Sequence, residues 1–495
     1  MGESSLLSLQ NGSDIRGTAM GPHTDLTGSA VNRIAQAFVL WLSEKSGKAP
    51  ETLTIGVGHD SRLTADALTA AALAGLAAAG AKGLCCSLAS TPAMFMGTVY
   101  PESAFDGSIM LTASHLPSDR NGMKFFTPAG GLEKEDIKAL LTRAERISPA
   151  DPGAAPVPFD LMALYTADLR RKICEGVMAP DFEHPLKGLH IVVDACNGAG
   201  GFFVSQVLVP LGADTAGSIY LEPDGSFPNH APNPENEQAM LAICRATLDA
   251  KADLGLIFDT DVDRMSAVLS DGTPIGRDAL IAMMAAILAP EYPGSTVVTD
   301  SVTSDRLTDF LENRLHLRHR RYKRGYRNVI NEARRLTDGG TMAPLAIETS
   351  GHGAVRDNYY LDDGAYLAVR LLIAAARLSA AGETLGRLIA DFIPPFEARE
   401  YRISIRARDA VAAARDILSA FERRCAAVGL AIDPNSCEGV RASDRRGWML
   451  LRMSLHEPVL PLNIEGNEPG DCDALADIAK AFFAEIDSVD PSVFD

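Results

Sequence analysis

The sequence predicts an α/β protein made of several similar units, followed by a smaller α+β module. The first observation is length, because 495 residues exceed the roughly 250–300 that one hydrophobic core supports. The second is that apolar, strand-like runs alternate with helical patterns over most of the chain. The third is that the pattern changes in the C-terminal part, where a long helix precedes further strands and another helix.

In the first unit, strand-like runs and helical patterns follow one another closely. Buried strands are predicted at 53–57, 83–88 and 108–111, with an alanine-rich helix at about 64–80. Because strand, helix and strand occur in succession, we expect a mostly parallel sheet with helices on both faces.

The alternation begins again twice. A second unit has strands at 189–194 and 254–258, with a glycine-rich turn and a helix after the first of them. A hairpin follows, with Asp271 and Gly272 at its turn. A third unit begins with a strand at 295–300 and contains the apolar run 344–347.

The C-terminal module is expected to close over the other units as a lid. Its predicted elements are a helix at about 409–429, strands at 447–453 and 462–464, and a helix at 474–486. Proline-containing segments near 148–158 and 393–396 indicate linkers. We therefore predict four domains, at 1–155, 156–275, 276–392 and 393–495.

Composition and charge narrow the function classes. The formal net charge of −18 argues against a general nucleic-acid binder, which needs a basic face. The eight cysteines include no C-x-x-C pair, which argues against a zinc knuckle. The N-terminus lacks the apolar stretch of a signal peptide, and the longest apolar run, at 279–289, is too short to span a bilayer. We therefore expect a soluble, cytoplasmic protein that binds neither nucleic acid nor membranes.

The most specific motif places Asp259, Asp261 and Asp263 at every second position directly after a strand. In an extended chain alternate side chains point the same way, so these carboxylates converge. A hard divalent cation is their natural partner. An EF-hand loop is excluded, because its sixth and twelfth positions are Arg264 and Ser270 instead of glycine and glutamate. The alternative is a solvated acidic turn.

A second motif surrounds Ser114, which follows the strand at 108–111 and should lie at the carboxyl edge of a sheet, where ligands usually bind. A serine hydroxyl needs activation to act as a nucleophile, and His115 and Lys124 are candidate helpers. The absence of a G-x-S-x-G elbow argues against a hydrolase. The alternative is a loop serine that caps a helix.

Two further motifs carry polar side chains. Glu348, Ser350 and His352 follow a buried strand and suit adjacent sugar hydroxyls, although a polar turn would contain the same residue types. The segment 318–327 is basic on an acidic chain. Most of it is expected to be a solvated face. One or two of its arginines, with Arg324 and Arg327 as candidates, could line an anion site.

Taken together and in this order, the motifs resemble those of the α-D-phosphohexomutase superfamily, which includes phosphoglucomutase, phosphomannomutase and phosphoglucosamine mutase. The likeness covers nearly the whole chain. It rests on G-S-D-I-R-G at 12–17, G-H-D-S-R at 58–62, the serine loop at 112–124, P-D-G-S-F-P-N-H at 223–230 with Asn233 and Pro234, D-T-D-V-D-R at 259–264 and E-T-S-G-H at 348–352.

The resemblance implies three similar mixed α/β domains and a C-terminal α+β domain around a central cleft. It implies that Ser114 carries a phosphate and that Ser114, Asp259, Asp261 and Asp263 hold Mg²⁺. Arg16 and Arg264 would stabilise the phosphoryl group, with His115 and Lys124 as acid–base or positioning groups. Glu348, Ser350 and His352 would bind the sugar, and a hexose 1,6-bisphosphate would be the activator.

The chain departs from the family in the phosphate-binding loop of the last domain. The family has approximately R-x-S-G/N-T-E-P there, with another arginine soon after. This chain has Arg452 and Ser454, but Leu455 and His456 replace the next two residues and Pro461 stands where the later arginine is expected. Arg452, Ser454 and His456 are still expected to hold the phosphate that is not transferred.

The resemblance implies a mutase that interconverts hexose 1-phosphate and hexose 6-phosphate, with mannose or glucose as the sugar. A phosphoglucosamine mutase is the nearest alternative. Further alternatives are a non-catalytic paralogue that binds sugar phosphates, and a bisphosphohexose synthase or phosphatase. A monomer or a dimer is expected.

Overall fold

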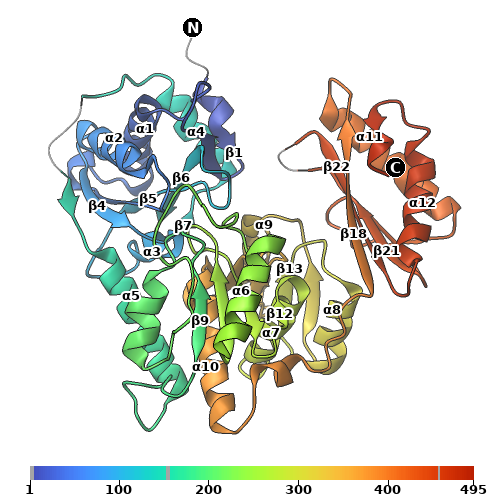
Figure 1. Cartoon of the computed structure of the whole chain (residues 1–495). Coiled ribbons are helices and arrows are strands. Elements are labelled where there is room, and N and C mark those ends of the chain that lie inside the picture. Colours follow the sequence, from blue (N-terminus) through green and yellow to red (C-terminus); the bar gives the residue numbers. More distant parts are fainter. Residues whose placement is uncertain (1–4, 152–155, 455–456, 495) are drawn as a thin grey trace. The chain divides into compact units, whose positions relative to one another are not determined.

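The computed structural model describes residues 5–151, 156–454 and 457–494. The chain divides into two compact units, one formed by residues 1–280 and 350–388 and the other by residues 281–349 and 389–495. The helices and strands of both are labelled in Figure 1. None of the described helices is long and apolar enough to cross a membrane.

The first sheet of the first unit mixes parallel and antiparallel pairs. Its strand order is β1-β2-β6-β5-β3-β4-β8, with β7 paired to β6. Strand β3 pairs in parallel with β4 and β5, whereas β6 is antiparallel to both β5 and β2. The bounds are β1 Gln10–Asn11, β2 Asp14–Thr18, β3 Thr54–His59, β4 Lys82–Leu88, β5 Gly107–Leu111, β6 Arg120–Thr127, β7 Gly130–Gly131 and β8 Val157–Pro158.

The sheet is therefore less parallel than predicted. The difference arises from β6, because residues 120–124 of the predicted serine loop form part of this strand. Asn121 and Gly122 interrupt the strand-like pattern, and β-propensity alone does not predict a strand there. The segment is a strand because it pairs with β5 on one side and with β2 on the other.

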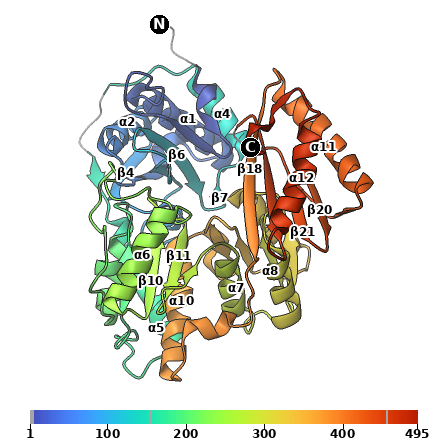
Figure 2. The same ribbon diagram turned by 45° about the vertical axis from the view of Figure 1, so that its right-hand side comes forward.

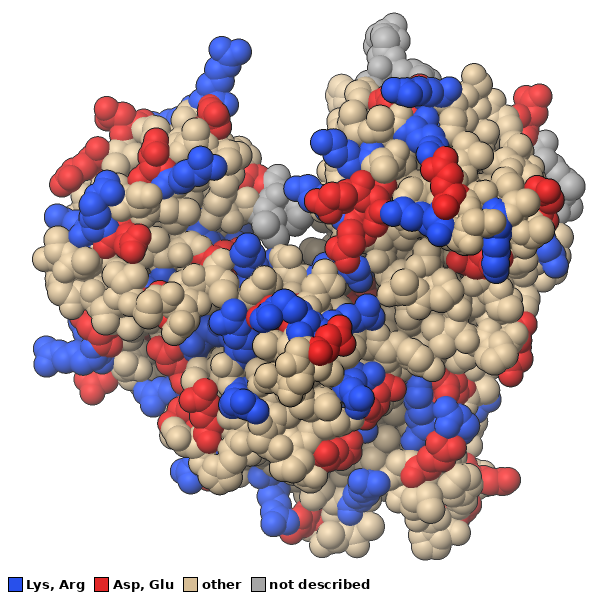
Figure 3. All heavy atoms as spheres, turned by 180° about the vertical axis from the view of Figure 1, so that it is seen from behind, with Lys and Arg blue, Asp and Glu red and all other residues tan. Residues whose placement is uncertain are grey.

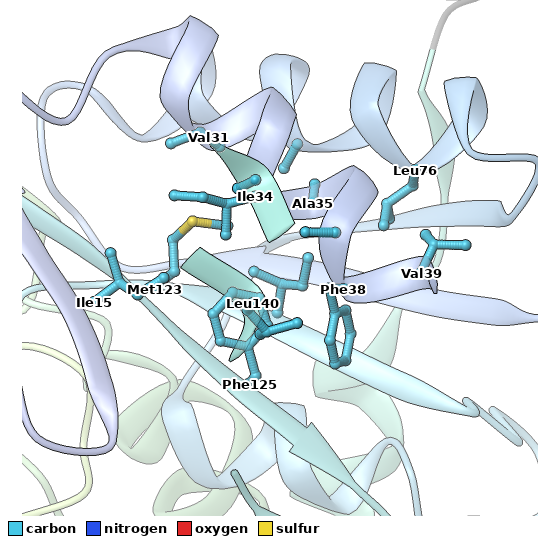
Figure 4. Packing of buried hydrophobic residues seen from close by; sticks show 14 of the residues in the cluster. Ile15, Val31, Ile34, Ala35, Phe38, Val39, Leu76, Met123, Phe125 and Leu140 are labelled. Carbon is cyan, nitrogen blue, oxygen red and sulfur yellow. The ribbon is translucent and has the colours of Figure 1, made fainter. Parts of the chain in front are cut away.

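Helices cover both faces of this sheet, as predicted. One face packs against α1 Gly28–Ser46, α2 Ala65–Ala78 and α4 Lys134–Ala144. On the other face lies α3 Thr91–Met96, where Ser108 Oγ donates a hydrogen bond to the Met94 carbonyl at 2.7 Å. Figure 4 shows the core beneath α1, with Phe38 beside Phe125 and their ring centroids 4.9 Å apart.

The second sheet of this unit has the order β12-β11-β10-β9. Strand β9 is parallel to β10, and the predicted hairpin joins β11 to β12, with Gly272 at a φ of 84°. After the glycine-rich turn the chain forms short π and 3₁₀ segments, η3 Phe203–Leu208 and η4 Val209–Leu211, in place of the predicted α-helix. The strands of this sheet are β9 Ile191–Asp194, β10 Leu254–Phe258, β11 Met265–Leu269 and β12 Pro274–Ile275. The other elements of the first unit are α5 Leu161–Val177, α6 Glu237–Ala250, β16 Gly353–Val355, β17 Leu361–Asp362 and α10 Gly364–Ala380.

The second unit contains a parallel set of strands and an antiparallel C-terminal sheet. Strand β13 Thr296–Thr299 pairs in parallel with β14 Arg318–Arg321 and β15 Leu345–Ile347. Helices α8 Asp305–Asp309 and α9 Tyr326–Asp338 follow β13 and β14, and α7 Arg277–Leu288 runs from the first unit into the second.

The C-terminal sheet has the order β19-β20-β21-β22-β18-β23. Helices α11 and α12 lie together on one face of it, as Figure 2 shows. The predicted class, α/β units followed by an α+β module, is therefore confirmed. The bounds are β18 Glu397–Ile405, α11 Ala410–Ala427, β19 Ala431–Ile432, β20 Val440–Asp444, β21 Gly447–Leu451, β22 Val459–Gly466, α12 Asp471–Phe483 and β23 Val489–Asp490.

The C-terminal sheet is bound to the loop after β13 within the same unit. Arg441 donates hydrogen bonds to the carbonyls of Ser301 and Thr303, and its guanidinium lies 3.7 Å from the ring centroid of Trp448. Ser304 Oγ donates to Glu465 at 2.6 Å.

Figure 3 shows a face of the molecule on which acidic and basic side chains are interspersed.

Replacing Phe38 by alanine should destabilise the first unit by about 3–5 kcal/mol, because the cavity under α1 cannot close. The chain has two tryptophans, Trp41 and Trp448, so a Trp448→Phe background leaves Trp41 as a reporter beside Phe38. Urea unfolding followed by Trp41 fluorescence measures the change. Leu40→Ala on the exposed side of α1 is the control and should shift the midpoint little.

Candidate active site

The loop after β5 holds Ser114 in a left-handed conformation, with φ at 50°. Such an angle is uncommon outside glycine and costs of order 1–3 kcal/mol, so the surroundings must enforce it. Thr112 Oγ1 accepts a hydrogen bond from the Ser114 amide at 2.8 Å. Ser114 is 4% exposed, and its Oγ donates to Asp259 Oδ2 at 3.1 Å. The turn therefore directs the hydroxyl at the acidic loop.

The acidic loop after β10 brings Asp259, Asp261 and Asp263 together, with ligand atoms within 4.8 Å of one another. Val262 between them has a φ of 66°, a rare angle for a β-branched residue. Backbone contacts enforce it, since the Gly364 amide donates to the Val262 carbonyl at 3.1 Å and the Ala199 amide to the Thr260 carbonyl at 2.8 Å.

The glycine-rich turn after β9 supports this loop by close approach. A Cβ at Gly198 would lie 2.6 Å from the Thr260 carbonyl oxygen, which leaves no room for a side chain. The glycine-rich turn is therefore a platform for the acidic loop.

The donor set fits a hard divalent cation. Asp261 Oδ1 and Asp263 Oδ1 are buried and accept no hydrogen bond from any described residue. Buried carboxylate oxygens without partners are costly, and oxygen ligands are what Mg²⁺ and Ca²⁺ prefer. Asp259 is close to the Ser114 hydroxyl. The predicted carboxylate cluster is thus formed, and a cation there would lie beside Ser114.

Charge in the cluster is shared unequally. Burial and then the carboxylates of Asp263 and Asp261 raise the pKa of Asp259 well above its ordinary value. Burial opposes ionisation of Asp263 too, but Lys124 and Arg264 outweigh it and lower its pKa. The raised pKa of Asp259 therefore favours its neutral form unless a further cation lies beside the loop.

Lys124 lies in β6, and its ammonium donates to Asp261 Oδ2 at 3.0 Å and to Asp263 Oδ2. Burial alone would lower its pKa, but the two aspartates raise the pKa well above the ordinary value. The sequence left it open whether Lys124 holds charge or moves protons, and in this structure it is a fixed ammonium ion.

Arg264 connects the acidic loop to Ser114 and to His352. One amino group donates to Ser114 Oγ at 3.4 Å, and its Nε donates to His352 Nε2 at 3.1 Å. Burial, followed by Arg264 and Lys124, lowers the pKa of His352 well below its usual value. Because Nε2 accepts from Arg264, the proton of this neutral ring is on Nδ1, which donates to Ser350 Oγ at 2.9 Å.

His115 and Arg16 complete the surroundings of Ser114. His115 Nδ1 lies 3.3 Å from Ser114 Oγ, and the charge of Arg264, burial and Arg16 lower the pKa of His115 to about 2. His115 is therefore neutral. Arg16 in β2 donates to the Thr112 carbonyl at 2.6 Å and to Asp14 Oδ2 at 2.8 Å.

The remaining predicted residues belong to the second unit. Glu348, directly after β15, accepts a hydrogen bond from the Gly325 amide at 2.6 Å. Arg324 Nε lies 3.7 Å from Asp300 Oδ2, and Arg327 is in the first turn of α9. The predicted sugar motif is thus divided, because Ser350 and His352 belong to the first unit.

Arg452 follows β21 and is 5% exposed. Burial lowers its pKa, an effect that Glu438 opposes and the nearby charge of Arg324 reinforces. The two arginines therefore lie in one charged cluster. The Ser454 amide donates to the Val459 carbonyl at 3.0 Å. His456, the third predicted phosphate ligand, lies outside the described residues.

Sequence reasoning missed two contacts of the site. Thr91, at the start of α3, donates through Oγ1 to Asp261 Oδ2, and its amide donates to the Asp261 carbonyl at 2.8 Å. Arg62 belongs to the motif at 58–62, and that motif does not predict its contact with the loop of Ser114. A helix-capping serine and a proline beside Thr91 mark only a helix start, so the sequence carries no signal for its contact.

Replacing Lys124 by methionine should destabilise the first unit by about 3–5 kcal/mol, since it removes one partner of a buried ion cluster. Saturating MgCl₂ should raise the thermal midpoint of the variant more than that of the wild type, because a dication then supplies the missing positive charge. Differential scanning calorimetry in EDTA and in MgCl₂ measures both effects. Lys82→Met, at an exposed position of β4, should neither destabilise the unit nor increase the effect of MgCl₂ on the thermal midpoint. A Lys124→Met protein with the wild-type midpoint in EDTA would contradict the expectation.

Comparisons with known proteins agree with this geometry. Residues 8–151, 174–272 and 276–396 match the families described as phosphoglucomutase/phosphomannomutase α/β/α domains I, II and III. The chain is 30% identical to a phosphomannomutase/phosphoglucomutase of Pseudomonas putida, over 86% of this chain and 86% of that protein. A protein of the same name from Pseudomonas syringae is 29% identical over 95% of each chain.

A solved structure has the same fold. It is a phosphoglucomutase/phosphomannomutase family protein from Burkholderia thailandensis, with a TM-score of 0.79 and 24% identity over 97% of this chain and 98% of that one. The predicted membership of the α-D-phosphohexomutase superfamily is confirmed, and this chain belongs to the phosphoglucomutase/phosphomannomutase family.

Proposed function

We propose that this protein interconverts hexose 1-phosphate and hexose 6-phosphate, with mannose or glucose as the sugar, through a phosphoserine at Ser114 and a bisphosphohexose intermediate. The observation that carries the proposal is the contact of Ser114 Oγ with both Asp259 and Arg264. A phosphate on this oxygen would have a metal-type carboxylate cluster on one side and a guanidinium on the other. Relatives with the names phosphomannomutase and phosphoglucomutase support the same activity.

Mg²⁺ is the cation that we assign to Asp259, Asp261, Asp263 and an oxygen of phosphorylated Ser114. When bound, it neutralises charge on the phosphoryl group and polarises the bond that breaks. The unpartnered oxygens of Asp261 and Asp263 support this assignment. A hexose 1,6-bisphosphate is the proposed activator, because it can load phosphate onto a serine that has lost it.

In the transfer step, the bond from phosphorus to Ser114 Oγ breaks and a bond forms to a free hydroxyl of the hexose monophosphate. The hydroxyl proton leaves and the serine oxygen regains one. His115 is placed to relay it, since its ring is neutral and Nδ1 lies 3.3 Å from Ser114 Oγ. Arg264 and Arg16 stabilise the phosphoryl charge, and the Lys124 ammonium holds Asp261 and Asp263 in position.

The sugar and its second phosphate require further contacts. We assign Ser350 and His352, and in the second unit Glu348, to the sugar hydroxyls. Arg324, Arg327, Arg452 and Ser454, with His456, are the proposed ligands of the phosphate that is not transferred. The cluster of Arg324 and Arg452 in the second unit supports an anion site there.

A coupled assay with glucose 1-phosphate, mannose 1-phosphate and glucosamine 1-phosphate, given Mg²⁺ and a bisphosphate activator, tests the function. We expect turnover of the glucose or mannose ester. Faster turnover of the glucosamine ester would favour the phosphoglucosamine mutase alternative. Release of inorganic phosphate or accumulation of bisphosphate would indicate a phosphatase or a bisphosphohexose synthase. No activity on any of the three would leave a sugar-phosphate-binding paralogue.

Phosphate on Ser114 should be visible directly. After incubation with glucose 1,6-bisphosphate, the protein should contain a species heavier by about 80 Da, the mass of one phosphate group. Intact-mass spectrometry detects it, and Ser114→Ala should lack it. Ser118→Ala, in the same loop, is the matched control and should keep the added mass. A phosphate that persists in Ser114→Ala would refute the proposed carrier.

Arg452→Met should raise KM about 10- to 100-fold, the equivalent of losing a hydrogen bond to a charged group worth about 1.5–3 kcal/mol. The fraction of protein phosphorylated at Ser114 should stay unchanged, because Arg452 belongs to the proposed site for the other phosphate. Initial rates over a range of substrate concentrations measure KM. Arg423→Met, at an exposed position of α11, is the control. An unchanged KM would remove Arg452 from the site.

A further inference from the structure

Arg62 is among the most deeply buried charged residues near Ser114, yet the proposed reaction gives it no role. It is 2% exposed, in the segment between β3 and α2. Its side chain donates four hydrogen bonds, all to backbone carbonyls of the loop that begins at Ser114. They join one amino group to Ser114 at 2.6 Å and Leu116 at 2.6 Å, and the other to Pro117 at 2.7 Å and Arg120 at 2.8 Å.

Four carbonyl dipoles that converge on one point repel one another unless a cation lies between them. The guanidinium suits this task because its donors form a rigid, planar fork. A lysine ammonium has three donors on one atom, so it cannot satisfy four carbonyls. One of the four belongs to Ser114 itself, whose φ of 50° must be enforced by its surroundings.

Asp60 and Phe227 hold the guanidinium from the other directions. Asp60 Oδ2 lies 3.4 Å from Arg62 Nε, and Asp60 Oδ1 accepts the Arg62 amide at 3.0 Å. The guanidinium carbon lies 5.4 Å from the ring centroid of Phe227. Phe227 belongs to the segment 223–230, a motif that the proposed reaction also leaves without a role.

This segment is pressed against the backbone of the Arg62 turn. A Cβ at Gly225 would lie 2.5 Å from the Ser61 carbonyl oxygen and 2.6 Å from Arg62 Cα, so only glycine fits. The segment is fixed at its far end, where His230 Nε2 lies 2.9 Å from Asp194 Oδ2 at the end of β9.

We propose that Arg62 is a positioning residue for the phosphoserine: it holds the loop 114–120 in the conformation that directs Ser114 Oγ at Asp259, and the segment 223–230 braces it through Phe227 and Gly225. The proposal rests on the proposed function, because it concerns the same serine. It assigns one purpose to two motifs, at 58–62 and at 223–230, that otherwise have none.

The test compares Arg62 with Arg33, a matched buried arginine. Arg33 in α1 is 8% exposed and donates to the carbonyls of Ala144 and Glu145 at 3.0 Å each, away from Ser114. Arg62→Lys and Arg62→Met should lower kcat and the rate of phosphorylation by glucose 1,6-bisphosphate about 100-fold, the size expected for a misplacement near 1 Å. KM should change less than about twofold, since Arg62 is proposed to touch no substrate. Arg33→Lys and Arg33→Met should lower the thermal midpoint but keep kcat per folded molecule.

The support that segment 223–230 gives to Arg62 is tested by Phe227→Leu and Gly225→Ala. Both variants should lower kcat, as the Arg62 variants do, and leave KM unchanged. Phe182→Leu, at an exposed phenylalanine of the same unit, should have no effect. The positioning role is wrong if the Arg62 variants keep the wild-type kcat. It is also wrong if they behave like the Arg33 variants, with a lower thermal midpoint and an unchanged kcat per folded molecule.

Hydrogen exchange separates this inference from the proposed function. Arg62→Lys should speed amide exchange in peptides that cover residues 112–122, whereas Arg33→Lys should leave those peptides unchanged. This measurement does not require turnover. A wild-type protein without mutase activity would refute the proposed function alone. Unchanged amide exchange in Arg62→Lys would refute the proposal that Arg62 holds the loop 114–120 in its conformation.

Discussion

Charge balance around three buried aspartates is the constraint on which the centre of the first unit depends. Asp259, Asp261 and Asp263 face two cations, Lys124 and Arg264, so one negative charge is in excess. Burial, and then the negative charges of Asp263 and Asp261, raise the pKa of Asp259. A phosphoserine adds about two negative charges and a bound dication adds two positive ones, so the balance is preserved when both are present. The strained backbone at Val262 and the contacts of β6 and α3 all serve to keep these charges in one place.

Much of the fold follows from the sequence, because short-range patterns dictate it. The apolar runs at 254–258 and 344–347 became strands β10 and β15, and the Asp271 and Gly272 turn formed its hairpin. Strand β6 could not be predicted, because its residues gain their extended conformation from pairing with β5 and β2. The helix expected after the glycine-rich turn is broken into short π and 3₁₀ segments that pack beneath β10.

The candidate site was predictable where its residues are close in sequence and chemically unusual, as in the alternating aspartates after β10. Protonation states were not predictable. The residue type of Lys124 allowed either a held charge or a proton shuttle, and two carboxylates from a segment more than a hundred residues away keep it charged. Arg62 and Thr91 were missed for a related reason: their partners are backbone atoms and distant side chains, which leave no local pattern.

The basic segment 318–327 also affects the outer edge of its sheet. Its first four residues form β14, the outer strand beside β13, and three of them are arginines. An outer strand offers unpaired backbone groups to any other extended chain. Here Arg318 and Arg320 lie on one face of the strand and Arg321 on the other, and the His319 amide already donates to Glu312 at 3.4 Å. Glu332 and Asp305 hold Arg320 and Arg321 in place. Because charged side chains on an outer strand disfavour pairing with another chain, the residues that stand out on an acidic chain also oppose aggregation at this edge.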